Sequence, residues 1–254
     1  MNRFPSKKQL DDLLKYYQSG NNDKTYQLAS TLTKEFPNDT FAWKILSVYY
    51  KKIGKISDSL ATIQKIVSLS PKDALAHYNL GNTFKDLKRY NEAKESYEKS
   101  IFLKPDFVEA IYNLGITFTA LEKFLEAERA YKKAVILKPD FADAYNNLGN
   151  VVESLGKLNE AEKYYKKALS LKPNFAEAYN NIGALFEKNG QFEDAKIAFE
   201  NAIKIDPLTT NAHRQLCLLK KFDSYDEQFF ILQKLNLNKS LSKEQHCNIN
   251  FSLA

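Results

Sequence analysis

Cysteine, glycine, proline and long apolar runs are all scarce in this chain of 254 residues, and each shortage excludes a class of protein. The two cysteines, Cys217 and Cys247, lie far apart without clustered histidines, so neither a disulfide framework nor a zinc site is indicated. No stretch approaches the roughly 18 consecutive apolar residues that a membrane span needs. Met1 to Leu14 contain no hydrophobic signal region. We therefore expect a cytoplasmic protein without membrane contact or metal.

Catalytic signatures are absent as well. The sequence has no nucleophile elbow, no glycine-rich phosphate loop and no metal-binding His/Glu pair. His77 and His213 fall in an otherwise apolar column, which is more typical of core residues than of bases. We expect no enzyme activity within these residues and no cofactor.

The net charge of +6 is not spread evenly along the chain. Between Thr40 and Asp73, six lysines face two acidic residues, whereas between Ala176 and Thr209 three lysines face six. Because this is a gradient and not a uniform basic stripe, nucleic-acid binding is disfavoured. Retention of the protein on heparin that falls steeply as salt rises would favour nucleic-acid binding.

The prolines reveal an internal repeat. Six of the seven follow one another at intervals of 34 residues: Pro37, Pro71, Pro105, Pro139, Pro173 and Pro207. This is the period of a two-helix solenoid unit. If each proline is position 32, the units begin at Thr40, Ala74, Val108, Ala142, Ala176 and Thr210.

All eight glycines fall into two columns of this frame. Position 8 carries Gly81, Gly115, Gly149 and Gly183, and position 15 carries Gly20, Gly54, Gly156 and Gly190. A glycine within a helix costs about 1 kcal/mol relative to alanine, so the first column predicts a close approach of two backbones. The second column predicts a left-handed residue that ends the first helix of each unit.

Polar residues after position 15 predict the start of the second helix. Ser57, Asn91 and Asn159 are expected as its N-caps. Acidic residues follow in the first turn, where the helix dipole favours anions: Asp58, Glu92, Glu126, Glu160 and Asp194.

Large apolar residues recur at positions 4, 7, 11 and 24, and alanine at positions 3 and 20. In the first helix these spacings of three and four form one stripe, which stacking on the next hairpin would bury. With Leu-Gly at positions 7 and 8, aromatic residues at 24 and proline at 32, the pattern resembles the tetratricopeptide repeat family. The resemblance implies an all-α fold, a right-handed α-solenoid of antiparallel helix pairs.

Three regions of the chain differ in how well they fit the 34-residue repeat pattern. Residues 40–209 form five repeats of 34 residues. Residues 1–39 keep Gly20 and Pro37 and are expected to form a divergent capping hairpin. Residues 210–254 are expected to be a degenerate sixth repeat, followed by a C-terminal helix from near Ser242 that is truncated.

In this family, positions 2, 5, 6, 9, 12 and 13 of the first helices line the concave groove. Here these columns are rich in carboxamides, because position 6 is asparagine in four consecutive units. A carboxamide can pair with both polar groups of a peptide unit, so the column is similar to the asparagine ladder in the repeat arm of O-linked N-acetylglucosamine transferases. The candidate groove residues are Asn79, Asn113, Asn147, Asn181, Asn82, Asn150, Asn146, Asn180, Tyr78, Tyr112, Lys44 and Lys51.

Two interpretations of the asparagine column remain open. Either it binds an extended peptide of a partner protein, or duplication has carried along an asparagine that bonds between neighbouring helices. In the first case Tyr78 and Tyr112 would supply side-chain pockets, and Lys44 and Lys51 would attract an acidic part of the ligand.

A different function follows from the last residues. The segments His213–Leu216, Lys220–Phe222, Leu241–Glu244 and Ile249–Ala254 are similar to the junction between tetratricopeptide repeats and a sulfotransferase domain in bacterial proteins. This resemblance implies a non-catalytic arm that presents substrate to a sulfotransferase or glycosyltransferase domain. The alternative is a free-standing adaptor.

Overall fold

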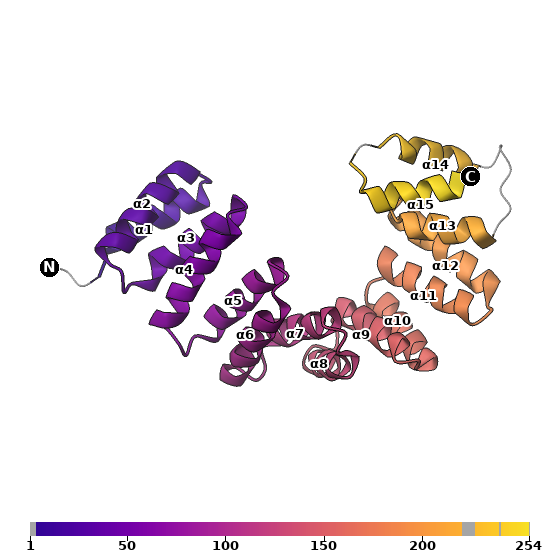
Figure 1. Cartoon of the computed structure of the whole chain (residues 1–254), viewed down its shortest axis with the longest axis horizontal. Helices are drawn as coiled ribbons and strands as arrows, with labels where there is room; N and C mark the ends of the chain where they lie inside the picture. The colour runs from indigo at the N-terminus through magenta and orange to yellow at the C-terminus, as the bar shows by residue number, and fades with distance from the viewer. Residues whose placement is uncertain (1–3, 220–226, 239, 254) are drawn as a thin grey trace. The chain divides into compact units, whose positions relative to one another are not determined.

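The computed structural model describes residues 4–219, 227–238 and 240–253. These residues form fifteen helices and no strand. The helices are α1 (Lys7–Gln18), α2 (Asn22–Glu35), α3 (Thr40–Lys52), α4 (Ile56–Leu69), α5 (Ala74–Asp86), α6 (Tyr90–Leu103), α7 (Val108–Ala120), α8 (Phe124–Leu137), α9 (Ala142–Ser154), α10 (Leu158–Leu171), α11 (Ala176–Lys188), α12 (Phe192–Ile205), α13 (Thr210–Leu219), α14 (Glu227–Asn236) and α15 (Lys243–Leu253) (Figure 1).

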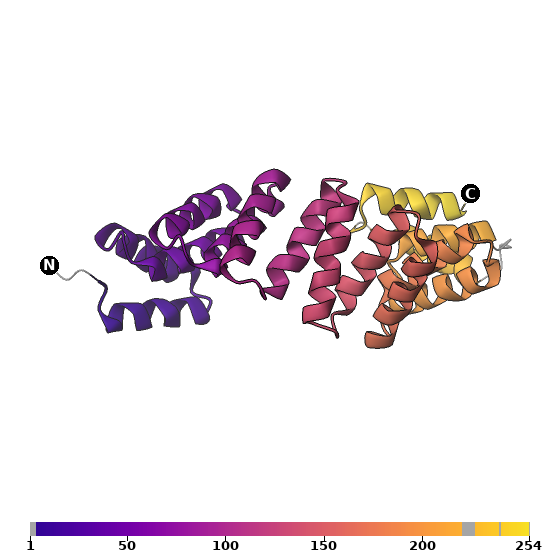
Figure 2. The same cartoon turned by 90° about the horizontal axis from the view of Figure 1, so that it is seen from below.

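The chain divides into two compact units, Met1–Ala130 and Tyr131–Ala254. Within each unit, consecutive helices pack as antiparallel pairs, such as α5 with α6 and α11 with α12 (Figure 2). The first helices α3, α5, α7, α9, α11 and α13 begin at the six residues that the proline frame predicts. The all-α, paired-helix architecture is therefore confirmed.

The residue at position 24, which is Ile63 in the first repeat and aromatic in the next four, is buried within each helix pair. Tyr97, Tyr165 and Phe199 are at most 1% exposed. Each ring lies over the glycine at position 8 of the same repeat, where a Cβ on Gly149 would stand 2.5 Å from a ring carbon of Tyr165. The close approach is thus between a helix backbone and an aromatic ring, and the expected contact of two backbones was wrong.

The turn inside each hairpin uses a left-handed residue, as predicted. Gly54, Gly156 and Gly190 have φ of 75° to 76°. Lys88 and Glu122 occupy the same column of the second and third repeats with φ of 57°, although they are not glycines.

The second helices begin two residues earlier than the capping pattern predicts. The N-caps are Lys55, Arg89 and Lys157, which make no side-chain capping hydrogen bond. Ser57 and the equivalent asparagines therefore lie inside the helix, and their expected capping role was wrong. The left-handed residue leaves only one residue before the next helix, so the cap falls on that residue whatever its side chain. The acidic residues do occupy the first turns.

The C-terminal residues pack differently from the repeats. α15 packs against both α13 and α14. Leu232, Leu241 and Ile249 form a small core, with Cys217 and Leu235 beside it. The predicted helix start is confirmed, because α15 follows Ser242, whose Oγ accepts the N–H of Gln245 while Gln245 Oε1 accepts the N–H of Ser242. Lys220–Phe222 lies outside the described residues.

No helix of the described residues combines the length and the apolar character needed to cross a bilayer. Within those residues there is also no group of three or more His, Cys, Asp or Glu side chains that could hold a metal ion.

Candidate functional site

Polar side chains of successive first helices join to form a row in each unit. The row consists of positions 2, 5, 6, 9, 12 and 13, which the helical spacing brings to one side of each first helix. Hydrogen bonds and ion pairs connect one first helix to the next through these positions. All candidate groove residues belong to the row.

In the unit Met1–Ala130, Asn113 bonds to the preceding repeat. Its Nδ2 donates to Asn82 Oδ1 at 2.8 Å and lies 3.3 Å from the hydroxyl oxygen of Tyr78. Asn82 Oδ1 also accepts the hydroxyl of Tyr97 at 2.7 Å. Because both N–H donors of Asn113 have partners and its side chain is only 9% exposed, this carboxamide joins two neighbouring repeats.

Asn79 contrasts with Asn113 although both occupy position 6. Asn79 is exposed, on the same helix as Tyr78. The ring of Tyr78 is half-buried and packs 4.9 Å from the ring of Phe107, centroid to centroid. Tyr112, on α7, is also half-buried. Asn79 is therefore the candidate amide of this unit that solvent reaches most freely.

The candidate lysines are paired with aspartates at the two ends of α5, its N-cap Asp73 and its last residue Asp86. Lys44 Nζ lies 3.1 Å from Asp73 Oδ2, and Lys51 Nζ lies 2.7 Å from Asp86 Oδ2. Burial would raise the pKa of Asp73, but hydrogen bonds from Lys44 and from backbone N–H groups of α5 hold it below its usual value. Burial lowers the pKa of Lys85, partly against the attraction of Asp86. Both candidate lysines remain about half exposed.

In the unit Tyr131–Ala254, carboxamides link α9, α11 and α13. Asn181 Nδ2 donates to Asn146 Oδ1 at 3.1 Å, and Asn146 Nδ2 donates to Glu177 Oε1 at 3.0 Å. Asn146 is only 1% exposed, whereas Asn180 and Asn181 are half-buried. Asn211 Nδ2 lies 3.4 Å from Asn180 Oδ1. Position 6 donates to position 5 of the preceding repeat, as it does in the first unit.

Asn150 belongs to the network around a buried tyrosine. The hydroxyl of Tyr165 lies 2.7 Å from Asn150 Oδ1 and 2.9 Å from Glu153 Oε2. Burial, together with the negative charge of Glu153, raises the pKa of this hydroxyl. Lys188 Nζ lies 3.8 Å from Glu153 Oε1. Asn147 is half-buried on the same helix.

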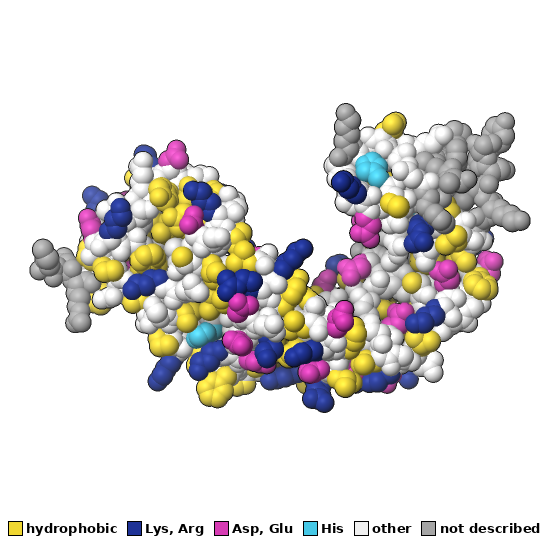
Figure 3. All heavy atoms as spheres, in the orientation of Figure 1, with side chains coloured by type: hydrophobic (Ala, Val, Ile, Leu, Met, Phe, Trp, Pro, Cys, Tyr) yellow, Lys and Arg dark blue, Asp and Glu magenta, His cyan; other side chains and the backbone are white. Residues whose placement is uncertain are grey.

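The two rows differ in charge. The row of α3, α5 and α7 carries Lys44, Lys51, Lys52 and Lys85 against Asp86 and Glu109. The row of α9, α11 and α13 carries Asp143, Glu153, Glu177 and Glu187 against Lys188 and Arg214. On the face shown in Figure 3, basic and acidic side chains are interspersed within each unit.

Three apolar residues of the row were missed by the sequence reasoning. Val48, Leu75 and Leu218 are 46%, 50% and 54% exposed and occupy positions 9, 2 and 9. The signal was available, because these are apolar residues in columns that do not belong to the buried stripe. By the register of the row, Val48 faces position 6 of the next repeat, which is Asn79.

The residue at position 4 ties the preceding turn to the first helix. His77 Nε2 and His213 Nε2 lie 3.0 Å from the carbonyl oxygens of Pro71 and Pro207, six residues earlier. Trp43 Nε1 donates in the same way to Pro37. An acceptor at Nε2 selects the tautomer protonated there, so both histidines are structural donors.

Comparisons with known proteins agree with this architecture. The family model described as tetratricopeptide repeat matches residues 74–107, 142–175 and 176–207, and a second model, described as TPR repeat, matches residues 117–156. A comparison with curated proteins finds no match.

Solved structures similar to this chain include three repeat proteins. MamA is 29% identical, with a TM-score of 0.61 over 64% of this chain and 95% of MamA. YrrB, a TPR protein with an unusual peptide-binding site, is 24% identical, with a TM-score of 0.61 over 72% of this chain and 95% of YrrB. PilF of Pseudomonas aeruginosa is 20% identical, with a TM-score of 0.68 over 83% of this chain and 96% of PilF.

Proposed function

Because the chain is a tetratricopeptide repeat protein, we propose that it is a protein-interaction module that binds an extended peptide of a partner along its first helices. The observation that carries the proposal is the mixed chemistry of the first row. Exposed Val48 and Leu75 stand among the amide and lysine side chains of α3 and α5. A single exposed apolar residue is ordinary on a protein surface, but two of them beside amides and lysines on successive first helices offer a peptide both apolar contacts and hydrogen bonds.

The asparagines divide into two roles under this proposal. Asn113 and Asn146 hold neighbouring repeats together, since their amide groups are nearly buried and bonded within the protein. Asn79 is exposed and offers its carboxamide to a peptide backbone. Asn181 donates one N–H to Asn146, and among the residues that the structure describes its second N–H and its Oδ1 have no other partner, so both can serve the same purpose.

Magnitudes indicate that amides alone bind weakly. A net hydrogen bond is worth about 0.5 to 1.5 kcal/mol, whereas association costs at least about 4 kcal/mol. Apolar contacts with Val48 and Leu75 must therefore add to the binding energy, at about 25 cal/mol per Å² of buried apolar surface. We propose a ligand segment that alternates apolar side chains with free backbone groups.

The proposal is tested with peptides selected against the full chain from a display library. Binding is measured by fluorescence anisotropy. The double variant Leu75→Ala/Asn79→Ala should lose roughly tenfold in affinity, because it removes one apolar contact and one hydrogen bond. Its melting temperature should stay close to that of the wild type, since both side chains are exposed.

Two controls separate this role from general destabilisation. Phe102→Ala removes a side chain that is 76% exposed on the second helix α6, away from the row, and should leave affinity unchanged. Asn113→Ala should lower the melting temperature, because it removes the hydrogen bonds that the Asn113 amide donates to Asn82 and Tyr78. Equal binding by Leu75→Ala/Asn79→Ala and wild type would refute the proposal.

The alternative hypothesis, that the chain is the non-catalytic arm of a sulfotransferase or glycosyltransferase, rests on the resemblance of its last residues. A strand and a glycine-rich phosphate loop encoded directly after Ala254 would support it. A stop codon there would support the free-standing adaptor.

A further inference from the structure

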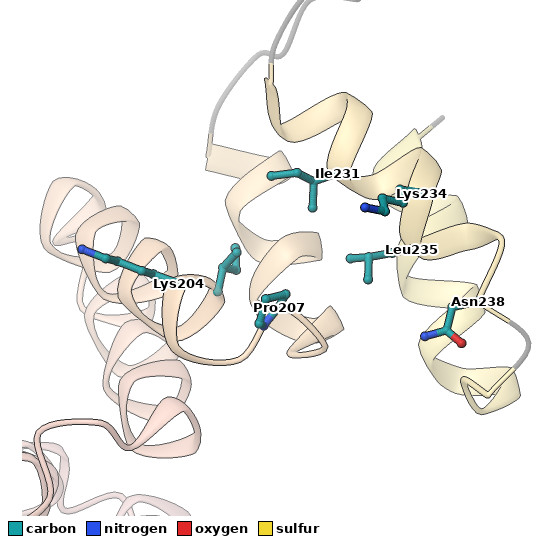
Figure 4. Close-up of a pocket in the computed structure, with 7 residues that line it drawn as sticks. Lys204, Pro207, Ile231, Lys234, Leu235 and Asn238 are labelled. Atoms are coloured by element: carbon teal, nitrogen blue, oxygen red, sulfur yellow. The ribbon is translucent and has the colours of Figure 1, made fainter.

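An apolar cavity lies at the C-terminal end of the second unit, outside the row of first helices. Its volume is about 570 Å³; α12, the turn before α13 and α14 border it, and it is partly open to solvent (Figure 4). The walls are Ile203, Pro207, Ile231 and Leu235, with Lys204, Lys234 and Asn238 beside them. The apolar walls and the small number of polar groups are typical of a small-molecule site, for which volumes of about 300 to 1,000 Å³ are usual.

One face of α14 lines the cavity. Ile231, Lys234, Leu235 and Asn238 follow at intervals of three and four, so they form a single stripe that extends just past the helix end. Leu232, on another side of the helix, is 1% exposed and packs with Ile249 of α15. α14 is therefore held by α15, while Ile231 and Leu235, the latter also beside the small core, line the cavity.

The cavity has the electrostatics of an anion site at one end. Lys234 turns its ammonium group toward the space beside Ile231, whereas Lys204 runs along α12 away from α14 (Figure 4). None of the described residues that line the cavity is acidic. Within the described part of the chain, the Lys234 ammonium has no ion-pair partner. Asn238 Oδ1 accepts hydrogen bonds from Ser240, which leaves its Nδ2 donors for a ligand.

We propose that this cavity binds a medium-chain fatty acid, with the alkyl chain against Ile203, Pro207, Ile231 and Leu235 and the carboxylate at Lys234. An unpaired ammonium beside apolar walls complements a molecule that has one anionic end and one apolar tail. The cavity volume suits a single alkyl chain. The two chains of a phospholipid would not fit within it, and a cationic amphiphile would be repelled by Lys234.

The test is isothermal titration of the full chain with octanoate, decanoate and dodecanoate, each below its micellar concentration. Each buried methylene is worth about 0.8 kcal/mol, so the Kd should fall roughly fourfold per added methylene until the cavity is full. Decanol should bind more weakly than decanoate, and decyltrimethylammonium more weakly still. A Kd that does not depend on chain length would overturn the proposal, as would equal binding of the cationic amphiphile.

Variants locate the site. Lys234→Gln should weaken decanoate binding roughly threefold to tenfold and leave decanol unchanged, because only the charge pair is lost. Lys167→Gln removes the same charge from an exposed position on α10 and should change neither affinity. Ile231→Trp should fill the cavity and abolish binding of both ligands.

The loss of binding in Ile231→Trp supports the site only if circular dichroism shows that this variant has wild-type helicity. If this variant misfolds, the Lys234→Gln comparison between decanoate and decanol decides the matter. Equal loss of both ligands in Lys234→Gln, or no loss of either, contradicts the assignment. Failure of these tests would leave the proposed peptide function untouched, since none of the variants lies in the row of first helices.

Discussion

At the scale of the residue, the glycines at position 8 are explained by aromatic rings. The rings of Tyr97, Tyr165 and Phe199 lie where a Cβ on the facing glycine would stand, at 2.5 to 2.8 Å. The spacing of the glycines along the sequence revealed that something comes close to the helix. The spacing could not reveal that an aromatic ring is the contacting group, because position 24 lies 16 residues later and its aromatic residues are equally consistent with an ordinary core position.

His213 gives the protein a dependence on pH. Its side chain is buried, and burial lowers its pKa, partly against the hydrogen bond to the carbonyl of Pro207. The folded protein therefore binds fewer protons than the unfolded chain at pH values between the lowered pKa and about 6.5, the usual value. Stability rises with pH through that window, so it is full above about pH 6.5 and is lost as the pH falls below it.

Urea denaturation of the wild type and of His213→Gln, measured from pH 7.5 down to pH 5, tests this expectation. The variant should be less stable at pH 7.5, because its side chain does not reproduce the packing of the imidazole, yet it should lose less stability on acidification. Parallel pH profiles of the two proteins would show that His213 does not carry the effect. Direct titration of the His213 ring by NMR provides the independent check.

At the scale of the element, the hairpin turn places a left-handed residue at position 15. Glycine adopts this conformation freely, whereas other residues pay about 1 to 2 kcal/mol in steric strain. Lys88 and Glu122 adopt it with φ of 57°. The turns of the second and third repeats are therefore strained relative to those at Gly54 and Gly156.

Lys88→Gly should stabilise the protein by about 0.5 to 1 kcal/mol, since relief of strain exceeds the added entropy of the unfolded chain. Glu122→Gly should act in the same direction. The matched control is Lys88→Ala, which keeps a Cβ in the left-handed region and should bring no gain. Thermal unfolding by calorimetry measures all three, and a gain for the alanine variant equal to that for glycine would contradict the strain argument.

The sequence predicted helix starts better than it predicted caps. The first helices begin at Thr40, Ala74 and their equivalents because the proline and alanine columns fix the period independently of any one residue. The start of the second helix depends on backbone geometry at the turn, which places Lys55 and Arg89 at the cap regardless of their side chains. Capping propensity favoured Ser57 and Asn91 as N-caps, but the geometry of the turn determined where the helix begins.

The candidate site was harder to predict than the helices for a related reason. Register places an asparagine in the row but does not say whether its amide faces a neighbour or solvent. Asn113 and Asn79 share position 6, yet the first meets Asn82 of the preceding repeat, whereas position 9 of the repeat before Asn79 is Val48. The partner residue in another column decides the role of each asparagine.

At the scale of the whole molecule, the two units present rows of opposite charge. Lysines exceed acids in the row of α3, α5 and α7, and acids exceed bases in the row of α9, α11 and α13. Ion pairs such as Lys51–Asp86 and Lys188–Glu153 neutralise only part of this difference. Each unit should therefore select a different kind of peptide segment.

An acidic peptide bearing a photocrosslinker should label the unit Met1–Ala130, and a basic peptide of the same apolar pattern should label Tyr131–Ala254. Mass spectrometry of the crosslinked fragments identifies the unit. Labelling should weaken as salt rises toward 0.5 M, because exposed charges are screened over about 10 Å at 0.1 M and over shorter distances at higher salt. Indiscriminate labelling by both peptides would show that charge does not select the unit.

The hydrogen bond from the side chain at position 4 to the preceding proline carbonyl affects how far neighbouring repeats can bend relative to each other. Between α4 and α5 a hydrogen bond restrains the connection, because His77 Nε2 donates to the carbonyl oxygen of Pro71. At the next joint the same position is Ile111, whose aliphatic side chain has no donor to offer Pro105. The contact between these two repeats therefore depends on the amide of Asn113, which bonds to Asn82 and Tyr78 of α5. Asn113→Ala should let the first unit bend more at this joint, so that its row adjusts its curvature more readily to a bound chain.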